Sequence, residues 1–313
     1  MQKSTTPDWD NLRIFLAVMR AGSATAAARQ LALDHTTVAR RVRALEETLG
    51  SLLFERSRRS GFQPTAEGQR LLTHAETMES ALQAACESVS GSGGALSGQV
   101  RIGCTEAFGS HFIMPALAGF QDAHPDITLD VLPVPHFVSL SRREADIAIT
   151  LERPARGPYV TARLCDYALG LYATPDYLNQ HAAIHAREDL RAHRFVSYVE
   201  DLAFSRELLY LDEVVPGARR PLRSTSALAQ HQAVRGGQAL GILPCFLADS
   251  DAQLVRVLPD AVNVVRQFWM SYSEDLRRLR RVTAVAAHLA EQARLAEDLL
   301  LGQRCGSDGN GQA

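Results

Sequence analysis

The stretch Asp34–Gly50 reads DHTTVARRVRALEETLG and determines how the first part of this chain folds. Its apolar side chains recur at intervals of four, three and four residues, which places them in one stripe along a helix: Val38, Val42, Leu45 and Leu49. The polar side chains of the opposite face are Thr36, Arg40 and Arg43, with Thr37 and Arg41 beside them. Asp34 is a favourable N-cap and Gly50 a favourable stop. We therefore predict a helix that buries valine and leucine and exposes threonine and arginine.

A second, shorter helix is predicted directly before this one, over residues 23–31 (SATAAARQL). Ser23 suits its N-cap, and its small alanines would let a neighbouring helix approach closely. Only Ala32 and Leu33 separate it from Asp34, and two helices with so short a turn make a helix-turn-helix. The exposed arginines and threonines could then contact base edges and phosphates in a DNA major groove. The alternative is an ordinary amphipathic surface helix with solvated arginines.

Flanking segments complete the first domain. Residues 9–21 predict a helix on which the two-helix unit rests, and Leu53 and Phe54 are expected to fill the small core. The Arg/Ser/Gly-rich residues around 57–61 suggest a hairpin tip, or wing, whose arginines contact phosphates: Arg56, Arg58 and Arg59. A solvated loop is the alternative for this segment.

A long helix is predicted from Thr65 to about residue 90. Its apolar residues keep a heptad spacing: Leu71, Ala75, Met78, Leu82, Ala85 and Val89. Such a seam favours pairing with a second copy of the chain, and a two-fold dimer matches a paired DNA half-site. Packing against its own domain is the alternative.

Composition marks a domain boundary after this helix. Residues 90–98 (SGSGGALSG) have the composition of a flexible linker. We expect a DNA-binding domain over residues 1–64, a dimerisation helix over 65–90, a linker over 91–98, an effector-binding domain over 99–302 and a disordered tail over 303–313.

Beyond residue 98 the pattern alternates between strands and helices, which indicates an α/β domain with a parallel sheet covered on both faces. Strands are predicted over residues 100–103, 127–132, 145–150, 168–172, 195–198, 240–244 and 262–272, and helices over 112–124, 175–178, 228–235 and 276–301. Two lobes, with the chain crossing near residues 165 and 268, would form a clamshell.

Ligands of such folds bind beyond the carboxyl ends of the strands, between the lobes. The candidate effector-binding residues at those ends are Thr105, Glu106, Thr150, Ser197, Thr225 and Ser226. Hydroxyls and helix N-termini suit a small organic anion. Glu106 would repel an anion, so an amine or a hydroxyl on the ligand is the alternative. Turn capping is the commoner role of any one of these hydroxyls.

Composition excludes several other classes. The net charge is −2, so any nucleic-acid contact must come from a local patch. The five cysteines show no zinc spacing, and we expect buried, reduced thiols in a cytoplasmic protein without a signal peptide or a membrane span. No nucleophile elbow, phosphate-binding loop, dinucleotide motif or metal-binding histidine pair is present. We therefore expect no catalytic residue, cofactor or metal, which argues against an enzyme that carries a DNA-binding module. The N-terminal module and the lack of a secretion signal argue against a solute-binding protein.

From about Trp9 to Leu301 the sequence resembles the LysR-type transcriptional regulators. The resemblance is carried by the helix over residues 23–31, the run VARRVRALEETLG over 38–50, LFER over 53–56 and PTAEG over 64–68. Further matches are RIG over 101–103, IMP over 113–115, ADIAI over 145–149 and LGILP over 240–244.

This resemblance implies a winged helix-turn-helix, a dimerisation helix and a two-lobed domain similar to periplasmic binding proteins. It also implies a tetramer built from two dimers, with double-stranded DNA and a small-molecule effector as partners. By position, His35, Thr36, Thr37 and Arg40 correspond to base-reading residues, and Arg56 with the wing to DNA-backbone contacts. Thr105, Thr150 and the pair Thr225 and Ser226 correspond to effector-site positions.

Overall fold

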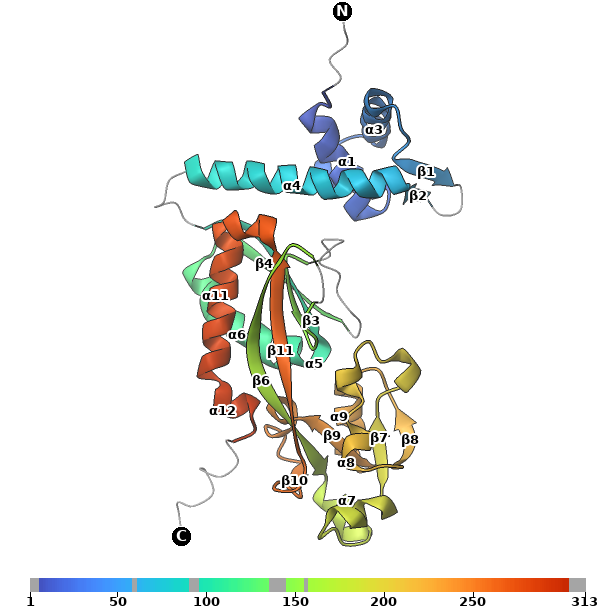
Figure 1. Ribbon diagram of the computed structural model, residues 1–313, viewed down its shortest axis with the longest axis vertical. Coiled ribbons are helices and arrows are strands. Elements are labelled where there is room, and N and C mark those ends of the chain that lie inside the picture. Colours follow the sequence, from blue (N-terminus) through green and yellow to red (C-terminus); the bar gives the residue numbers. More distant parts are fainter. Residues whose placement is uncertain (1–5, 58–60, 90–95, 135–144, 155–156, 304–313) are drawn as a thin grey trace, which may run out of the picture. The chain divides into compact units, whose positions relative to one another are not determined.

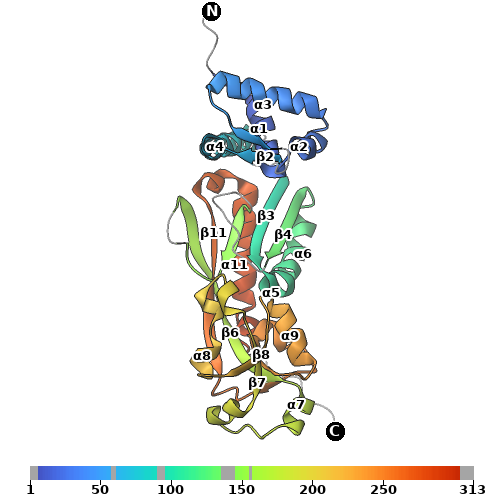
Figure 2. The ribbon, with the colours of Figure 1, turned by 90° about the vertical axis from the view of Figure 1, so that its right-hand side faces the viewer.

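The computed structural model describes residues 6–57, 61–89, 96–134, 145–154 and 157–303 (Figure 1). Contacts along the backbone divide the chain into two compact units, residues 1–93 and 94–313. Helices and one hairpin make up the first unit, and a mixed sheet with helices makes up the second (Figures 1 and 2). The predicted multidomain architecture is therefore confirmed.

The first unit contains the predicted helix-turn-helix. Its described elements, in chain order, are α1 (Trp9–Ala21), α2 (Ala24–Leu31), α3 (His35–Leu49), β1 (Phe54–Ser57), β2 (Gly61–Pro64) and α4 (Ala66–Val89). The strands β1 and β2 pair antiparallel and form the predicted hairpin beside the helices.

Local capping sets where these helices begin and end. Ser23 Oγ accepts a hydrogen bond from the backbone N–H of Ala26 at 3.1 Å, and Asp34 Oδ1 accepts one from Thr36 N–H at 2.7 Å. Helix α3 stops at Gly50, whose φ of +65° is a left-handed conformation that glycine adopts without steric cost. The predicted caps are confirmed.

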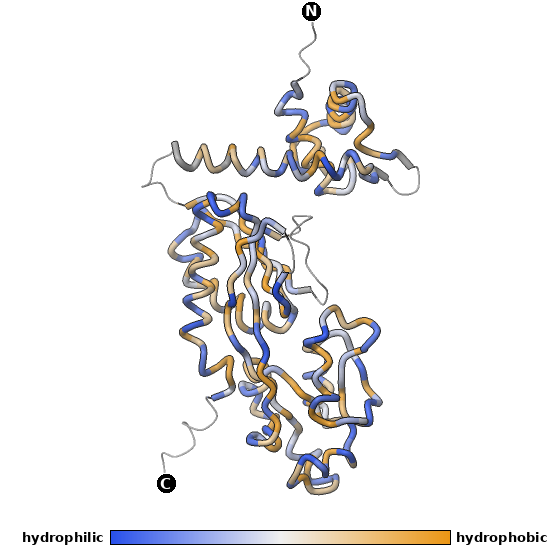
Figure 3. The backbone as a smooth tube through the Cα atoms, viewed as in Figure 1, coloured by the Kyte–Doolittle hydropathy of each residue, from blue (hydrophilic) through white to orange (hydrophobic). Residues whose placement is uncertain are grey.

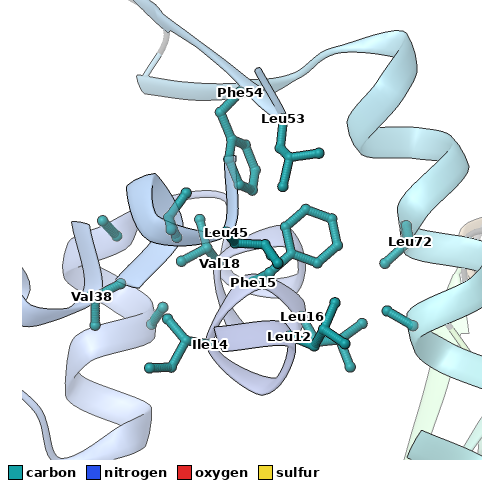
Figure 4. Packing of buried hydrophobic residues seen from close by; sticks show 14 of the residues in the cluster. Leu12, Ile14, Phe15, Leu16, Val18, Val38, Leu45, Leu53, Phe54 and Leu72 are labelled. Atoms are coloured by element: carbon teal, nitrogen blue, oxygen red, sulfur yellow. The ribbon is translucent and has the colours of Figure 1, made fainter. Parts of the chain in front are cut away.

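Figure 4 shows the core of the first unit, where Phe15 of α1 and Leu45 of α3 meet Phe54 of the hairpin. The rings of Phe15 and Phe54 lie 5.5 Å apart between centroids. Complete burial of a side chain the size of Leu45 contributes roughly 1.5–3 kcal/mol. Leu49 departs from the prediction, because it lies in the last turn of α3 beyond this core and is 37% exposed.

Glu46 is a buried acid of α3 that the hydrophobic pattern did not single out. Its Oε1 accepts hydrogen bonds from the backbone N–H groups of Leu53 at 2.9 Å and Phe54 at 3.3 Å. These bonds satisfy two buried donors and fix the point at which the chain enters β1.

The predicted seam of α4 is divided between two environments. Ala75 is completely buried in the core of its own unit, and Leu71 packs partly against that core, so assigning Ala75 to a dimer contact is wrong. The first turns of α4 are needed to cover α1, which explains the difference. Further along, Met78 is 49% and Leu82 48% exposed, and Ala85 is also exposed. The side chain of Val89 lies outside the described residues.

The second unit is built on one mixed sheet, whose described strands follow the order β4-β3-β5-β11-β6-β9-β7-β8, with β10 paired to β6. Their bounds are β3 (Gly98–Thr105), β4 (Ile127–Val134), β5 (Ile147–Thr150), β6 (Tyr159–Ala173), β7 (Arg194–Ser197), β8 (Arg219–Arg223), β9 (Leu240–Pro244), β10 (Val255–Val257) and β11 (Asn263–Ser273).

Two strands, β6 and β11, run through both lobes of this unit (Figure 1). They pair antiparallel, with a register shift between Phe268 and Trp269 where the chain passes from one lobe to the other. The predicted crossings near residues 165 and 268 are confirmed. A wholly parallel sheet is wrong, because a chain that crosses twice in opposite directions must pair antiparallel. Parallel pairs remain within each lobe, between β3 and its neighbours and between β7 and its neighbours.

Helices cover the sheet of the second unit. The described ones are α5 (Glu106–Phe108), α6 (Met114–Ala123), α7 (Pro175–Gln180), α8 (Leu211–Val214), α9 (Ala227–Arg235), α10 (Cys245–Ala248), α11 (Arg280–Leu295) and α12 (Glu297–Leu300). Figure 3 shows hydrophobic and hydrophilic residues alternating along α11, and its buried side includes Val282, Val285 and Leu289.

Two predicted helices differ in detail. The helix expected over residues 112–124 starts with a π-helical turn, Gly109–Ile113, which ends where Met114 N–H bonds Gly109 O, just before Pro115. The helix expected over 276–301 is broken at Leu279 and Ala296. Burial of Leu276, Leu279 and Leu300 requires the chain to bend there, and tertiary packing overrides local helix propensity.

Candidate functional site

The first candidate site is the exposed face of α3. His35, Thr36, Arg40 and Arg43 are exposed and Thr37 is half-buried, while Val38 and Val42 on the opposite face are completely buried. Within the described part of the chain, neither Arg40 nor Arg43 has a carboxylate within 4 Å, so both guanidinium groups remain available to a partner. The hydroxyl of Thr36 donates to Asp34 Oδ1 at 2.5 Å. This bond and the backbone bond from Thr36 lower the pKa of the Asp34 carboxyl.

Arg41 differs from the other arginines of α3. It lies 3.3 Å from Asp8 and 3.5 Å from Asp10, and it donates to Asn11 Oδ1 at 3.2 Å. These contacts tie α3 to the beginning of α1. The prediction that Arg41 belongs with the available basic residues is corrected, because its guanidinium group is already held by three partners.

The predicted wing contacts are only partly described. Arg56 lies in β1, opposite Phe62 in the register of the hairpin. Arg58 and Arg59 lie outside the described residues, and so does the side chain of Arg56.

The second candidate site is a cavity of about 40 Å³ between the lobes of the second unit. It contains three of the predicted residues, Thr105, Glu106 and Thr225. The remaining lining residues are mostly apolar or aromatic: Ala107, Leu151, Tyr167, Leu169, Tyr198, Phe204, Leu208, Tyr210, Ala227, Pro244, Phe246 and Phe268. The carboxyl end of β3 supplies the first two predicted residues, and the turn before α9 supplies the third.

The other predicted hydroxyls are used elsewhere. Thr150 Oγ1 donates to the carbonyl oxygen of Glu152 at 2.7 Å, and Ser197 Oγ donates to the carbonyl oxygen of Tyr198 at 3.2 Å. Ser226 Oγ caps α9 by accepting a bond from Ala229 N–H at 3.0 Å. None of these three residues lines the cavity. Their assignment to the effector site is therefore corrected to turn and cap formation.

Aromatic rings form most of the cavity wall. Tyr167 and Phe268, from the crossing strands, stack with their centroids 4.4 Å apart. Tyr198 and Tyr210 meet at 89° with centroids 6.2 Å apart. The sequence analysis missed these rings, because aromatic residues in strands are usually core and only the position of Tyr198, directly after β7, marked a strand end.

Hydrogen bonds and charges settle the state of these tyrosines. Tyr210 donates its hydroxyl to the carbonyl oxygen of Ile242 at 3.1 Å. Burial raises the pKa of Tyr167, Tyr198 and Tyr210 above the usual range, and the nearby charge of Glu106 raises that of Tyr198 further. All three hydroxyls therefore stay protonated at neutral pH.

A segment that follows β7 covers one side of the cavity and is fastened by charged groups. Ser205 Oγ donates to Glu152 Oε1 at 2.6 Å, which links this segment to the turn after β5. Arg266 of β11 lies 2.7 Å from both Glu207 and Glu213. These contacts hold Phe204 and Leu208 against the opening.

Buried thiols and possible metal ligands do not add a further site. Cys104 and Cys245 are buried, and burial raises the pKa of the Cys104 thiol to about 12. Among the described residues no group of three or more histidine, cysteine or acidic side chains is arranged to hold a metal ion. No described helix is long and apolar enough to span a bilayer.

Comparison with known proteins agrees with this arrangement. The family model described as "Bacterial regulatory helix-turn-helix protein, lysR family" matches residues 9–69, and "LysR substrate binding domain" matches residues 93–294. The Mau operon transcriptional activator of Paracoccus denitrificans is 31% identical over 288 residues, which cover 90% of this chain and 96% of that protein.

Solved structures share the fold at low sequence identity. Full-length OxyR from Pseudomonas aeruginosa matches with a TM-score of 0.72 and 19% identity, over 93% of this chain and 98% of that one. Full-length LysG from Corynebacterium glutamicum, solved with its effector Arg bound, matches with a TM-score of 0.61 and 18% identity, over 92% and 98% of the two chains.

A helix-turn-helix followed by a two-lobed ligand-binding domain defines a class, the effector-responsive regulators of transcription. Within that class, the chain belongs to the LysR family. It is a DNA-binding transcriptional regulator whose C-terminal domain senses a small molecule, and it is not an enzyme.

Proposed function

We propose that the exposed face of α3 reads the operator, with Arg40 and Arg43 as its main cationic contacts. The observation that supports this is the pair of exposed arginines without a carboxylate partner, on a helix whose other face is completely buried. Arginine binds guanine edges bidentately and also pairs with phosphates. Thr37 and His35 lie on the first turn and flank Arg40, whereas Arg41 positions α3 against α1.

The chain acts on DNA as a homodimer paired along the distal half of α4. Met78 and Leu82 support this, because two large apolar side chains are about half exposed on one face of the helix. Residues at positions 78, 82 and 85 keep the heptad spacing of a two-helix contact. Two such dimers form the tetramer that the family resemblance implies, and the protein works in the cytoplasm, where its DNA lies.

The effector occupies the cavity that Thr105, Glu106 and Thr225 share with the aromatic rings. Its walls come from both lobes and from both crossing strands, so a ligand there contacts every part whose relative position can change. A ligand that binds one arrangement of the lobes more tightly shifts the population toward it.

The DNA-reading proposal is tested by footprinting of the full-length protein on genomic fragments recovered by selection. We expect protection of two half-sites related by a dyad, centred about one helical turn or a multiple of it apart. A single unpaired protected site would contradict the dimer, and no sequence-specific protection would contradict the α3 proposal.

The effector cavity is tested by filling it. Ala227 lines the cavity at the first turn of α9, and Ala227→Leu occupies its space. Reporter expression from the selected operator is measured in cells grown on a panel of carbon and nitrogen sources. We expect the wild-type response to be lost in Ala227→Leu and kept in the control Ala229→Leu, which alters an exposed position of the same helix. A wild-type response in Ala227→Leu would contradict the assignment of the cavity.

A further inference from the structure

Glu106 places a carboxylate in the wall of the cavity without a compensating partner. It is the first residue of α5, directly after β3, and its Oε2 is completely buried. Within the described part of the chain this oxygen accepts no hydrogen bond. A buried carboxylate oxygen without a donor costs several kcal/mol of solvation, so such a group is retained where a ligand supplies the missing donor.

The remaining charge around the cavity does not neutralise Glu106. Glu106 is the only charged residue among the described residues that line it. Arg266 acts electrostatically on Tyr167 from nearby, but its guanidinium group contacts Glu207 and Glu213, each at 2.7 Å. The cavity therefore keeps a negative potential, which opposes an anionic ligand.

The rings around Glu106 have the arrangement that suits a cation. Tyr198 and Tyr210 form a right-angled corner, and Tyr167 with Phe268 forms a stacked wall. Cations are attracted to the faces of such rings within about 6 Å of the centroid, and perpendicular rings offer more than one face to the same group. The Glu106 charge also acts on the Tyr198 hydroxyl, which places the carboxylate on the same side of the cavity as that corner.

We infer that the effector is a small organic cation, a primary ammonium compound whose N–H groups donate to Glu106 and whose carbon atoms contact the tyrosine and phenylalanine rings. This inference rests on the proposed assignment of the cavity as the effector site. A volume of about 40 Å³ holds only a few water-sized groups, which limits the ligand to roughly three to five non-hydrogen atoms in this arrangement of the lobes.

The inference is tested by titration calorimetry of the full-length protein with three compounds of similar size. Propylammonium chloride supplies the charge, 1-propanol is its neutral counterpart and sodium propionate is the anion, all at matched ionic strength. We expect saturable binding of one propylammonium per chain and no binding of the other two. Stronger binding of 1-propanol or propionate, or no saturable binding of propylammonium, overturns the inference.

Glu106→Gln keeps the size of the side chain and removes its charge. We expect about ten- to hundredfold weaker propylammonium binding, because hydrogen bonds to a charged group are the stronger ones. An unchanged dissociation constant overturns the role of Glu106.

A second pair of variants keeps the test independent of Glu106. Tyr198→Leu removes a ring face, and Tyr198→Phe keeps the face without the hydroxyl. We expect several-fold weaker binding in the first and wild-type binding in the second. Equal losses in both overturn the ring contact.

Failure of this inference is distinguishable from failure of the effector site itself. If the ligand class is wrong, Ala227→Leu still abolishes the reporter response while propylammonium does not bind. If the cavity is not the effector site, Ala227→Leu responds like the wild type.

Discussion

Arg40→Ala is the most direct test of how this regulator reads DNA. Arg40 is exposed on α3 and has no carboxylate partner among the described residues, so removing its side chain breaks no ion pair in the free protein. The exposed position also makes a large change in the free energy of unfolding unexpected, with about 0.5 kcal/mol as the upper bound. The effect of the substitution should therefore appear almost entirely in the complex.

The expected magnitude follows from the geometry of a dimer. A bidentate arginine contact to a base contributes about 1–3 kcal/mol of discrimination, and a two-fold dimer makes that contact twice. The loss is then about 2–6 kcal/mol, and since 1.4 kcal/mol corresponds to a factor of ten, affinity should fall about 30-fold or more. If Arg40 instead contacts a phosphate, binding weakens equally on all sequences and the salt dependence falls by about one ion per contact.

The assay is fluorescence anisotropy with the selected operator and a scrambled duplex, each at several salt concentrations. Arg13→Ala is the matched control, because Arg13 is an exposed arginine of α1 that pairs with Asp10 at 2.8 Å. We expect the control to bind both duplexes like the wild type. Operator affinity within threefold of wild type in Arg40→Ala, with unchanged salt dependence, would refute the assignment of α3 as the reading helix.

Three further outcomes are expected. Gly68→Ala should lower the stability of the first unit by about 1–3 kcal/mol, because a Cβ there would lie 2.2 Å from the carbonyl oxygen of Leu53; urea unfolding measures this, and Gly119→Ala, which meets no atom within 4 Å, should not destabilise. Leu82→Asp should give monomers in analytical ultracentrifugation, while Thr73→Asp, on the opposite side of α4, should leave the dimer intact; a dimeric Leu82→Asp would remove α4 as the interface. Burial lowers the pKa of His193 and His231, so as the pH falls through about 6.5 the unfolded chain binds protons before the folded one and stability decreases toward pH 5; urea midpoints that fall less steeply in His193→Gln would support this, and equal slopes would contradict it.

Local periodicity was sufficient for the helix-turn-helix. The spacing of Val38, Val42 and Leu45 and the caps at Ser23 and Asp34 act within a few residues, so each can be recognised in a single sequence. The same holds for the position of Thr105 and Glu106 at the end of β3, because a strand followed by a turn residue is also a local signal.

Contacts between distant residues decided the rest. The heptad pattern treats Ala75 and Leu82 alike, yet α1 covers the first and leaves the second exposed. Arg40 and Arg41 are adjacent arginines, and only the approach of Asp8 and Asp10 separates a residue that is available for DNA from one that holds two helices together.

The chemistry of the cavity also required the tertiary structure. Tyr167, Tyr198, Tyr210 and Phe268 come from widely separated parts of the chain, and the antiparallel pairing of β6 with β11 brings them together around Glu106. Whether a hydroxyl faces a ligand or caps a turn depends on which hydrogen-bond partner is nearer in space, as Thr150 and Ser226 show. Sequence alone determined the class of this protein through patterns that repeat every few residues, whereas the identity of the residues that can touch a ligand depended on packing across the whole domain.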